Sequence, residues 1–302
     1  MLPREGFVTT DDDVRLFFQT VGSGPKTVVV PNGFYLVDDF APLADGRTIV
    51  FYDARNRGRS ESVDDPSKLE RGVLRDVDDL EIVRRHFGID AIDVIGHSYM
   101  GLMVILYAMT YGAHVNRVVP IGPVEPKQGK PYPPHLTGAD ATLQDCLARL
   151  AELQKERGTV DPQEFCRRFW SILRVIYVAN PADAGKITWG RCDLPNELNL
   201  MKYWTTITLP SIQRLDLTPD AIARVTAPVL IVHGRKDRSS PYGGGREWAL
   251  SLPDARLLTV DEAAHVPWIE APDLVFASIR TFLDGAWPEA ARHVESLELP
   301  EP

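Results

Sequence analysis

The six residues Gly96-His97-Ser98-Tyr99-Met100-Gly101 stand between a short β-rich run, residues 91–95, and an apolar segment, residues 102–111. The run predicts a buried strand, and the segment predicts a helix that starts directly after the turn. A serine on such a sharp strand-to-helix turn is held exposed above the sheet, where small neighbours permit the tight backbone. Met100 stands where the usual G-x-S-x-G pattern has its second glycine, so a serine that only caps the helix is the alternative interpretation.

Short strand-like runs alternate with longer helical patterns on both sides of this turn. The runs that predict strands are 14–21, 27–30, 48–52, 91–95, 115–121, 228–232 and 256–260, and the main helical patterns are 73–87, 102–111, 246–252 and 272–283. Such alternation favours a mostly parallel sheet flanked by crossover helices, because parallel strands need long connections. We therefore predict an α/β fold.

The alternation stops between about residues 122 and 227. A proline-rich entry leads there into helical patterns, one of which begins with Asp161-Pro162-Gln163-Glu164, a helix-capping sequence. We predict a core domain over 1–124 and 225–290, interrupted by a helical cap over 125–224. The acidic tail, 291–302, is expected to fray.

Composition narrows the classes of function. The 302 residues carry 33 Lys and Arg against 42 Asp and Glu, a net charge of −9, which argues against a nucleic-acid partner. No stretch reaches the roughly 20 apolar residues of a membrane-spanning helix, and the amino terminus shows no secretion signal. We expect a cytoplasmic protein that acts without nucleic acid or membrane, and a homo-oligomer is compatible with the sequence.

The cysteines and glycines give no sign of a cofactor. Cys146, Cys166 and Cys192 are odd in number and lack the C-x-x-C spacing, so we expect reduced thiols, with neither a disulfide framework nor a zinc site. Gly243-Gly244-Gly245 lacks the strand–glycine–helix spacing of a phosphate-binding loop and is expected to be a flexible loop. We predict no metal and no cofactor.

Two later strand ends carry the residues that a serine nucleophile requires. A neutral hydroxyl needs a general base, usually His, and that His needs an acid to orient it. The strand at 228–232 ends in HGRKD, which contains Asp237, and the strand at 256–260 ends in DEAAH, which contains Asp261 and His265. Ser98, Asp237 and His265 are the candidates, with Asp261 as a rival acid in a position that suits a turn.

These motifs resemble the α/β-hydrolase superfamily. GHSYMG at 96–101, HGRKD at 233–237 and AAHVPWIEAP at 263–272 are similar to its motifs in order and spacing, and YDARNRGRS at 52–60 is similar to its D-x-R-G-x-G-x-S stretch, with Asn56 replacing a glycine. The resemblance covers roughly 14–125 and 225–285, and is closest to the cap-bearing branch with esterase-like and proline iminopeptidase-like members. The helical insertion would be that branch's variable cap.

The resemblance implies roles for individual residues. Ser98 would be the nucleophile, His265 the base and Asp237 the orienting acid. The backbone N–H groups of Tyr99 and Phe34 would form the oxyanion hole, although Asn32 stands where the family more often has His.

Two further histidines lie near the candidate residues. His97 is expected to point away from the nucleophile, and His233 is expected to pack at a strand end.

The substrate class is inferred from the cap. It is rich in aromatic residues, and Tyr35 of the core with Trp170 and Trp204 of the cap are expected to line an apolar pocket over the serine. An aminopeptidase needs a carboxylate for the substrate ammonium, but Asp193 and Glu197 are expected to be solvated.

A serine nucleophile, in place of Asp, argues against dehalogenase and epoxide hydrolase chemistry. We predict a carboxylesterase acting on a small-molecule ester. A proline iminopeptidase-like enzyme is the alternative, and a non-catalytic ligand-binding homologue is a third.

Overall fold

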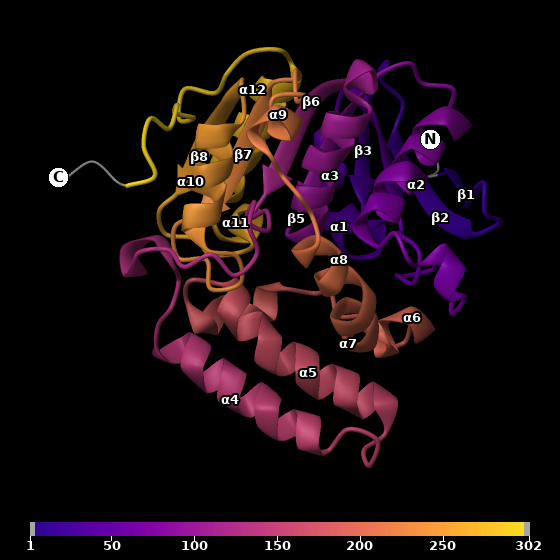
Figure 1. Ribbon diagram of the computed structural model, residues 1–302, viewed down its shortest axis with the longest axis vertical. Coiled ribbons are helices and arrows are strands. Elements are labelled where there is room, and N and C mark those ends of the chain that lie inside the picture. Colours follow the sequence, from indigo (N-terminus) through magenta and orange to yellow (C-terminus); the bar gives the residue numbers. More distant parts are fainter. Residues whose placement is uncertain (1–3, 299–302) are drawn as a thin grey trace.

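A single eight-stranded sheet forms the centre of the computed structural model, which describes residues 4–298 (Figure 1). Its strands lie in the order β1-β2-β4-β3-β5-β6-β7-β8. The strands are β1 Arg4–Thr9, β2 Arg15–Gly22, β3 Lys26–Pro31, β4 Arg47–Tyr52, β5 Ile92–His97, β6 Val115–Ile121, β7 Val229–Gly234 and β8 Ala255–Val260. β2 is antiparallel to β1 and to β4, and the other pairs are parallel. The predicted α/β class with a mostly parallel sheet is therefore confirmed, and β1 is the strand that the pattern did not predict.

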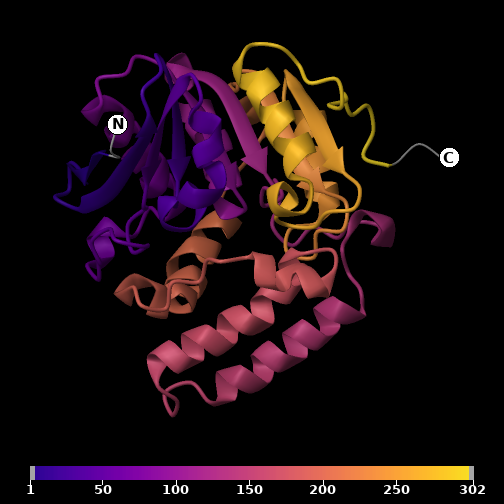
Figure 2. The ribbon, with the colours of Figure 1, turned by 180° about the vertical axis from the view of Figure 1, so that it is seen from behind.

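Helices cover both faces of the sheet, as the crossover rule requires. α2 Val73–His86, α3 Tyr99–Thr110 and α10 Tyr242–Ser251 pack on one face, while α1 Gly33–Phe40 and α12 Pro272–Leu283 pack on the other, with the short α11 Pro267–Glu270 before α12. Figure 2 shows α12 in front of the sheet, on the side hidden in Figure 1. Each face thus has its own apolar core, made mainly of branched aliphatic side chains.

The three glycines at 243–245 do not form the flexible loop that we expected. They lie buried in the first turn of α10. A Cβ at Gly245 would lie 2.2 Å from Nδ1 of His233, and one at Gly243 would lie 2.5 Å from the ring of Tyr132. The glycines therefore let α10 approach its neighbours more closely than a side chain would permit.

Between β6 and β7 the chain forms helices that lie over one edge of the sheet (Figure 1). They are α4 Ala141–Lys155, α5 Pro162–Tyr177, α6 Pro195–Leu198, α7 Leu200–Tyr203, α8 Leu209–Gln213 and α9 Pro219–Ile222. Asp161 caps α5 by accepting from the N–H groups of Gln163 and Glu164, both at 3.0 Å. The division into core and cap domains stays a prediction.

No helix among the described residues has the length and apolarity to cross a bilayer.

A disulfide joins Cys166 of α5 to Cys192, with 5.8 Å between their Cα atoms, so the expectation of reduced thiols is wrong for this pair. The two residues are 26 positions apart and meet only because the chain after α5 folds back on that helix. An odd count of cysteines could not reveal this, since the third, Cys146, is a buried free thiol.

The carboxyl-terminal segment is tied to the core in its described part. The guanidinium of Arg246 in α10 donates to the carbonyls of Leu297 and Ser296, both at 2.8 Å, and of Glu298 at 2.9 Å. The fraying predicted for 291–302 is thus wrong for 291–298, and residues 299–302 lie outside the described residues.

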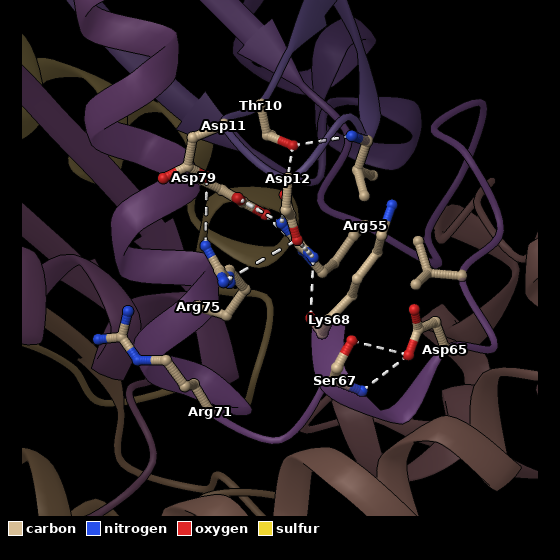
Figure 3. Close-up of polar contacts among 12 residues, drawn as sticks. Thr10, Asp11, Asp12, Arg55, Asp65, Ser67, Lys68, Arg71, Arg75 and Asp79 are labelled. Atoms are coloured by element: carbon tan, nitrogen blue, oxygen red, sulfur yellow. Dashed lines mark hydrogen bonds and ion pairs between the residues drawn. The ribbon is translucent and has the colours of Figure 1, made fainter.

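A buried arginine holds the loop that follows β4 (Figure 3). The Arg55 guanidinium donates to both carboxylate oxygens of Asp79 in α2, each at 2.7 Å, to Asp12 at 3.0 and 3.2 Å, and to the carbonyl of Lys68 at 2.9 Å. The side chains of Arg55 and Asp79 are both fully buried. Arg55 therefore connects the loop over 53–60 to α2 and to the turn between the first two strands.

We expect Arg55→Met to lower the free energy of unfolding by about 3–5 kcal/mol, because it leaves the Asp79 carboxylate buried without its partner. The matched control is Arg71→Met, which removes the partner of Asp78 at a half-exposed surface pair and should cost below about 1 kcal/mol. Urea unfolding at pH 7 measures both. Equal losses in the two variants would contradict the assigned role of Arg55.

Candidate active site

Ser98 lies on the turn between β5 and α3 with a backbone that few non-glycine residues adopt, φ 58° and ψ −122°. Its N–H donates to the carbonyl of Ile121 at 2.9 Å, and its side chain makes no capping hydrogen bond. A Cβ at Gly96 would lie 2.1 Å from the carbonyl oxygen of Met100, and one at Gly101 would lie 3.1 Å from Pro123. The structure therefore favours a half-buried serine on a tight turn, with its hydroxyl not used for capping, over a helix-capping serine, and Gly101 is the second close-packed glycine.

His265 and Asp237 form a fully buried pair at the ends of β8 and β7. Nδ1 of His265 lies 2.8 Å from Oδ2 of Asp237, and the other carboxylate oxygen accepts the N–H groups of Ser239 at 2.8 Å and Ser240 at 2.9 Å. Burial alone would raise the pKa of Asp237, but the attraction of His265 and hydrogen bonds from His233 and His265 outweigh it and hold that pKa well below its usual value. Asp237 is therefore an ionised carboxylate that can orient the ring.

The second ring nitrogen of His265, Nε2, is buried and has no hydrogen-bond partner among residues 4–298. The ring packs against Gly122, where a Cβ would lie 3.1 Å from Nδ1. No hydrogen bond joins the Ser98 hydroxyl to this ring within the described chain. Such bonds are often long in unliganded enzymes and tighten when substrate binds.

The histidine next to the serine does not point away, so that expectation is wrong. The His97 ring lies 4.5 Å from the His265 ring, and its Nε2 lies 3.0 Å from the His265 carbonyl. Burial, followed by the charge of His265, lowers the pKa of His97 well below its usual value, so this ring is neutral.

The other predictions near the pair agree with the structure. His233 packs at the end of β7, with Nε2 3.2 Å from Oδ2 of Asp237. Asp261 is an exposed turn residue that binds Arg235 at 2.6 Å.

A cavity of about 290 Å³ opens above Ser98. Tyr35, Trp170 and Trp204, the three residues predicted for the substrate pocket, all line it. The complete lining is Asn32, Tyr35, Arg57, His97, Ser98, Tyr99 and Ser239 from the core, and Leu150, Phe169, Trp170, Leu173, Tyr177, Trp189, Leu200, Met201 and Trp204 from the segment between β6 and β7. The cavity is therefore mainly apolar and aromatic, and its size suits a small organic molecule.

Of the two backbone N–H groups expected to form the oxyanion hole, one has no acceptor among the described residues and the other is bound. Tyr99 is the first residue of α3, and its N–H has no acceptor among the described residues. The Phe34 N–H, in contrast, donates to Oδ1 of Asp53 at 2.8 Å. Because that donor is already occupied, the expectation for Phe34 is wrong.

Asn32 offers a different donor at the same place. It sits at the start of α1 in the left-handed conformation, φ 59°, and lines the cavity although only 3% of its surface is exposed. Its buried side-chain oxygen has no partner within residues 4–298, and its side chain lies within hydrogen-bonding reach of the Tyr35 hydroxyl. A side-chain amide beside Ser98 was not predicted, and the replacement of the family's His by Asn32 was the signal that could have indicated it.

Glu197 is buried, so its expected solvation is wrong. Its Oε1 accepts from Nε of Arg57 at 3.2 Å and from the N–H of Gly58 at 3.1 Å, and its Oε2 accepts from Nη2 of Arg57 at 3.3 Å. Asp193 is exposed and pairs with Arg191 at 2.8 Å, as expected for a solvated residue. The contact between the α6 turn and the loop after β4 buries Glu197.

A buried carboxyl lies beneath the turn that carries the serine. The Tyr99 hydroxyl donates to Asp76 of α2. Burial, reinforced by the negative charge of Asp79, raises the pKa of Asp76 to about 7. The neutral form of Asp76 therefore persists in the folded protein well above the pH at which an exposed carboxyl ionises.

This shift predicts a pH-dependent stability. The contribution of Asp76 to the free energy of unfolding is fully present below about pH 4 and is lost as the pH rises towards 7. The reason is that the carboxyl ionises at a lower pH in the unfolded chain than in the folded protein. Asp76→Asn stays neutral, so its unfolding free energy relative to the unchanged protein should rise by on the order of 3 kcal/mol between pH 4.5 and pH 8. Urea unfolding across this range measures the difference. A difference that does not change with pH would contradict the assignment.

Both the sequence and the structure are similar to those of known proteins. The family model described as alpha/beta hydrolase fold matches residues 26–272. Proline iminopeptidase PfmaB of Pestalotiopsis fici is 28% identical over 253 residues, 81% of this chain and 84% of that protein. A proline iminopeptidase of Heyndrickxia coagulans is 25% identical and covers 93% of this chain and 98% of its own. An esterase structure from Exiguobacterium antarcticum superposes with a TM-score of 0.71 at 16% identity, covering 93% of this chain and all of that one, which indicates a shared fold.

Proposed function

This chain belongs to the alpha/beta hydrolase fold family, and on that premise we propose that it is a serine hydrolase of carboxylic esters. Ser98 is the nucleophile, His265 the general base and Asp237 the acid that orients the base. The observation that carries the proposal is the buried His265–Asp237 pair, bonded through Nδ1 at 2.8 Å, whose Nε2 is left without a partner in the described chain. A ring held in this way can take one proton and return it.

The reaction follows from this arrangement. The Ser98 oxygen attacks the ester carbonyl while its proton passes to Nε2 of His265, and the resulting imidazolium is stabilised by the Asp237 carboxylate. The same proton then goes to the departing alcohol as the carbon–oxygen bond breaks, leaving an acyl group on Ser98. A water molecule, deprotonated by His265, releases the acid and restores the serine.

The negative charge that develops on the carbonyl oxygen needs donors in place before the reaction. We assign the Tyr99 N–H and the side-chain amide of Asn32 to this task, because both residues line the cavity and the Tyr99 N–H has no acceptor in the described chain. The amide has two hydrogens, so one can face the nearby Tyr35 hydroxyl while the other faces the substrate. Phe34 is replaced in this role because Asp53 holds its N–H.

The cavity favours an ester over a peptide with a free amino terminus. A substrate ammonium needs an open carboxylate, but both oxygens of Glu197 are taken by Arg57 and Gly58, and Glu197 does not line the cavity above Ser98. Most of that lining is aromatic or aliphatic, which suits an acyl or alkyl chain.

A proline iminopeptidase-like activity is the second candidate. Two observations favour it: the relatives named proline iminopeptidase match 81% and 93% of this chain, and a buried carboxylate, Glu197, does lie close to the site. A non-catalytic binding protein is less well supported, since ligand binding alone would not require the buried pair of Asp237 and His265.

The test is a hydrolysis screen of p-nitrophenyl esters of graded chain length beside proline p-nitroanilide, with Ser98→Ala as the matched control. We expect ester cleavage to exceed cleavage of the proline amide, and Ser98→Ala to reduce it by about 10⁴-fold or more, because the three residues act as a unit. A fluorophosphonate should label the unchanged protein at Ser98 alone, as shown by peptide mass spectrometry.

Two results would redirect the proposal. A preference for proline p-nitroanilide that depends on Ser98 would favour the iminopeptidase. Ester cleavage that persists in folded Ser98→Ala would remove Ser98 as the nucleophile.

Asn32→Ala should lower kcat by about 10²–10³-fold with a small change in KM, the loss typical of one missing oxyanion donor. Asn32→Asp should lower it at least as much, because a carboxylate cannot donate. Steady-state kinetics on a p-nitrophenyl ester, with thermal melting to verify the fold, measure both variants. A kcat within threefold of the unchanged enzyme would show that the hole is built without Asn32.

A further inference from the structure

Among the described residues, Arg57 is the only one with a permanent charge in the lining of the cavity above Ser98. The rest of the described lining is aromatic, aliphatic or neutral and polar, and the one histidine, His97, is uncharged because burial lowers its pKa. The Arg57 side chain is 14% exposed. A single guanidinium at the wall of an otherwise uncharged cavity is a distinctive feature that ester hydrolysis itself does not require.

Two of the three nitrogens of the Arg57 guanidinium are bound by Glu197, and the third is not bound by any described residue. Nε and Nη2 donate to Glu197, whose side chain is fully buried, and the plane of the group lies over the Phe34 ring with 5.1 Å from Cζ to the ring centre. Nη1 has no hydrogen-bond partner among residues 4–298. Since arginine presents five N–H groups in a rigid fork, fixing two of its nitrogens leaves the third as an oriented, charged donor.

The preceding arginine in the same loop shows the contrast. Every nitrogen of Arg55 has an acceptor among described residues, and its side chain is fully buried. All the nitrogens of Arg55 are therefore used in contacts within the protein, whereas Arg57 is fixed by two nitrogens and keeps Nη1 available among the described residues. The Glu197 carboxylate keeps Arg57 charged, because its attraction outweighs the effect of burial and raises the pKa of Arg57.

We propose that Arg57 anchors a carboxylate carried by the substrate, so that the preferred esters combine an apolar body with a carboxylate away from the scissile bond. This inference rests on the proposed ester hydrolysis and adds its substrate class. A charged hydrogen bond formed away from bulk water favours the anionic ester by roughly tenfold to a hundredfold over a neutral ester of the same shape. The same group repels an ammonium, which is consistent with the absence of an open carboxylate in the lining.

The test compares two matched pairs of esters by kcat/KM. Mono-p-nitrophenyl adipate against p-nitrophenyl hexanoate places the carboxylate on the acyl side, and 4-(hexanoyloxy)benzoate against phenyl hexanoate places it on the alcohol side. We expect the anionic ester to be preferred by roughly tenfold to a hundredfold in at least one pair. No preference in either pair would overturn the proposal.

The variants identify the residue responsible. Arg57→Met alone leaves Glu197 buried without a partner and can unfold the protein, so the double variant Arg57→Met/Glu197→Gln is included. Both should abolish the preference for the anionic ester, and Arg57→Lys should retain part of it. Arg191→Met, which removes one positive charge from the exposed surface, is the control and should keep the full preference. A preference that survives in the folded double variant would overturn the proposal.

A binding measurement separates this inference from the proposed function. Calorimetric titration of Ser98→Ala needs no turnover and uses a matched pair of amides for each side: adipamate against hexanamide for the acyl side, and 4-(hexanoylamino)benzoate against hexananilide for the alcohol side. We expect the anionic amide of at least one pair to bind tenfold or more tightly, and the advantage to vanish when Arg57→Met/Glu197→Gln is added. If no ester is cleaved but this advantage is found, the ester hydrolysis fails and the carboxylate anchor stands. Equal binding within both pairs would overturn the anchor whatever the enzyme cleaves.

Discussion

The positive φ of Ser98, 58° with ψ −122°, is the constraint on which the site depends. A side chain in that conformation is tolerated only when its surroundings enforce it, and here β5, the first turn of α3 and the carbonyl of Ile121 in β6 do so together. The same turn places Ser98 in the lining of the cavity and leaves the Tyr99 N–H at the start of α3 without an acceptor among the described residues. Gly96 is necessary because the backbone of Met100 leaves no room for a Cβ there, and a Cβ at Gly101 would be in tight contact with Pro123.

The parallel sheet brings the remaining groups to that turn. Asp237 and His265 follow β7 and β8, Asn32 follows β3, and the loop with Arg57 follows β4. Because parallel strands end at one edge, four loops that are far apart in the chain share one rim, which is where ligands of open α/β sheets bind. The helices between β6 and β7 then close the rim with apolar and aromatic side chains and create the cavity.

Buried charge in the loop over 53–60 links stability to recognition. Asp53 accepts the N–H groups of Phe34 and Arg59, each at 2.8 Å, and burial raises its pKa to about 6 despite these bonds. Arg55 binds the loop to α2, and Glu197 of α6 binds Arg57. The loop thus carries one arginine whose donors are all bound within the fold and one that also lines the cavity, and its Asp53 binds the N–H of Phe34.

The sequence by itself determined the features that local pattern encodes. The alternation of strand and helix, the sharp turn at Ser98 and the positions of Asp237 and His265 at strand ends all follow from short-range periodicity and spacing, and the fold that they predicted is present.

Only the tertiary structure decided the features that depend on contacts between distant segments. These are the pairing of Cys166 with Cys192 and the burial of Glu197 against Arg57, 140 residues away. They also include the hydrogen bond that occupies the N–H of Phe34 and the packing of the His97 ring against His265. Residue type and local spacing are the same whether such a group meets solvent, a partner or a cavity. What it meets is set by how α5, α6 and the loop after β4 pack, and that packing is a property of the whole chain.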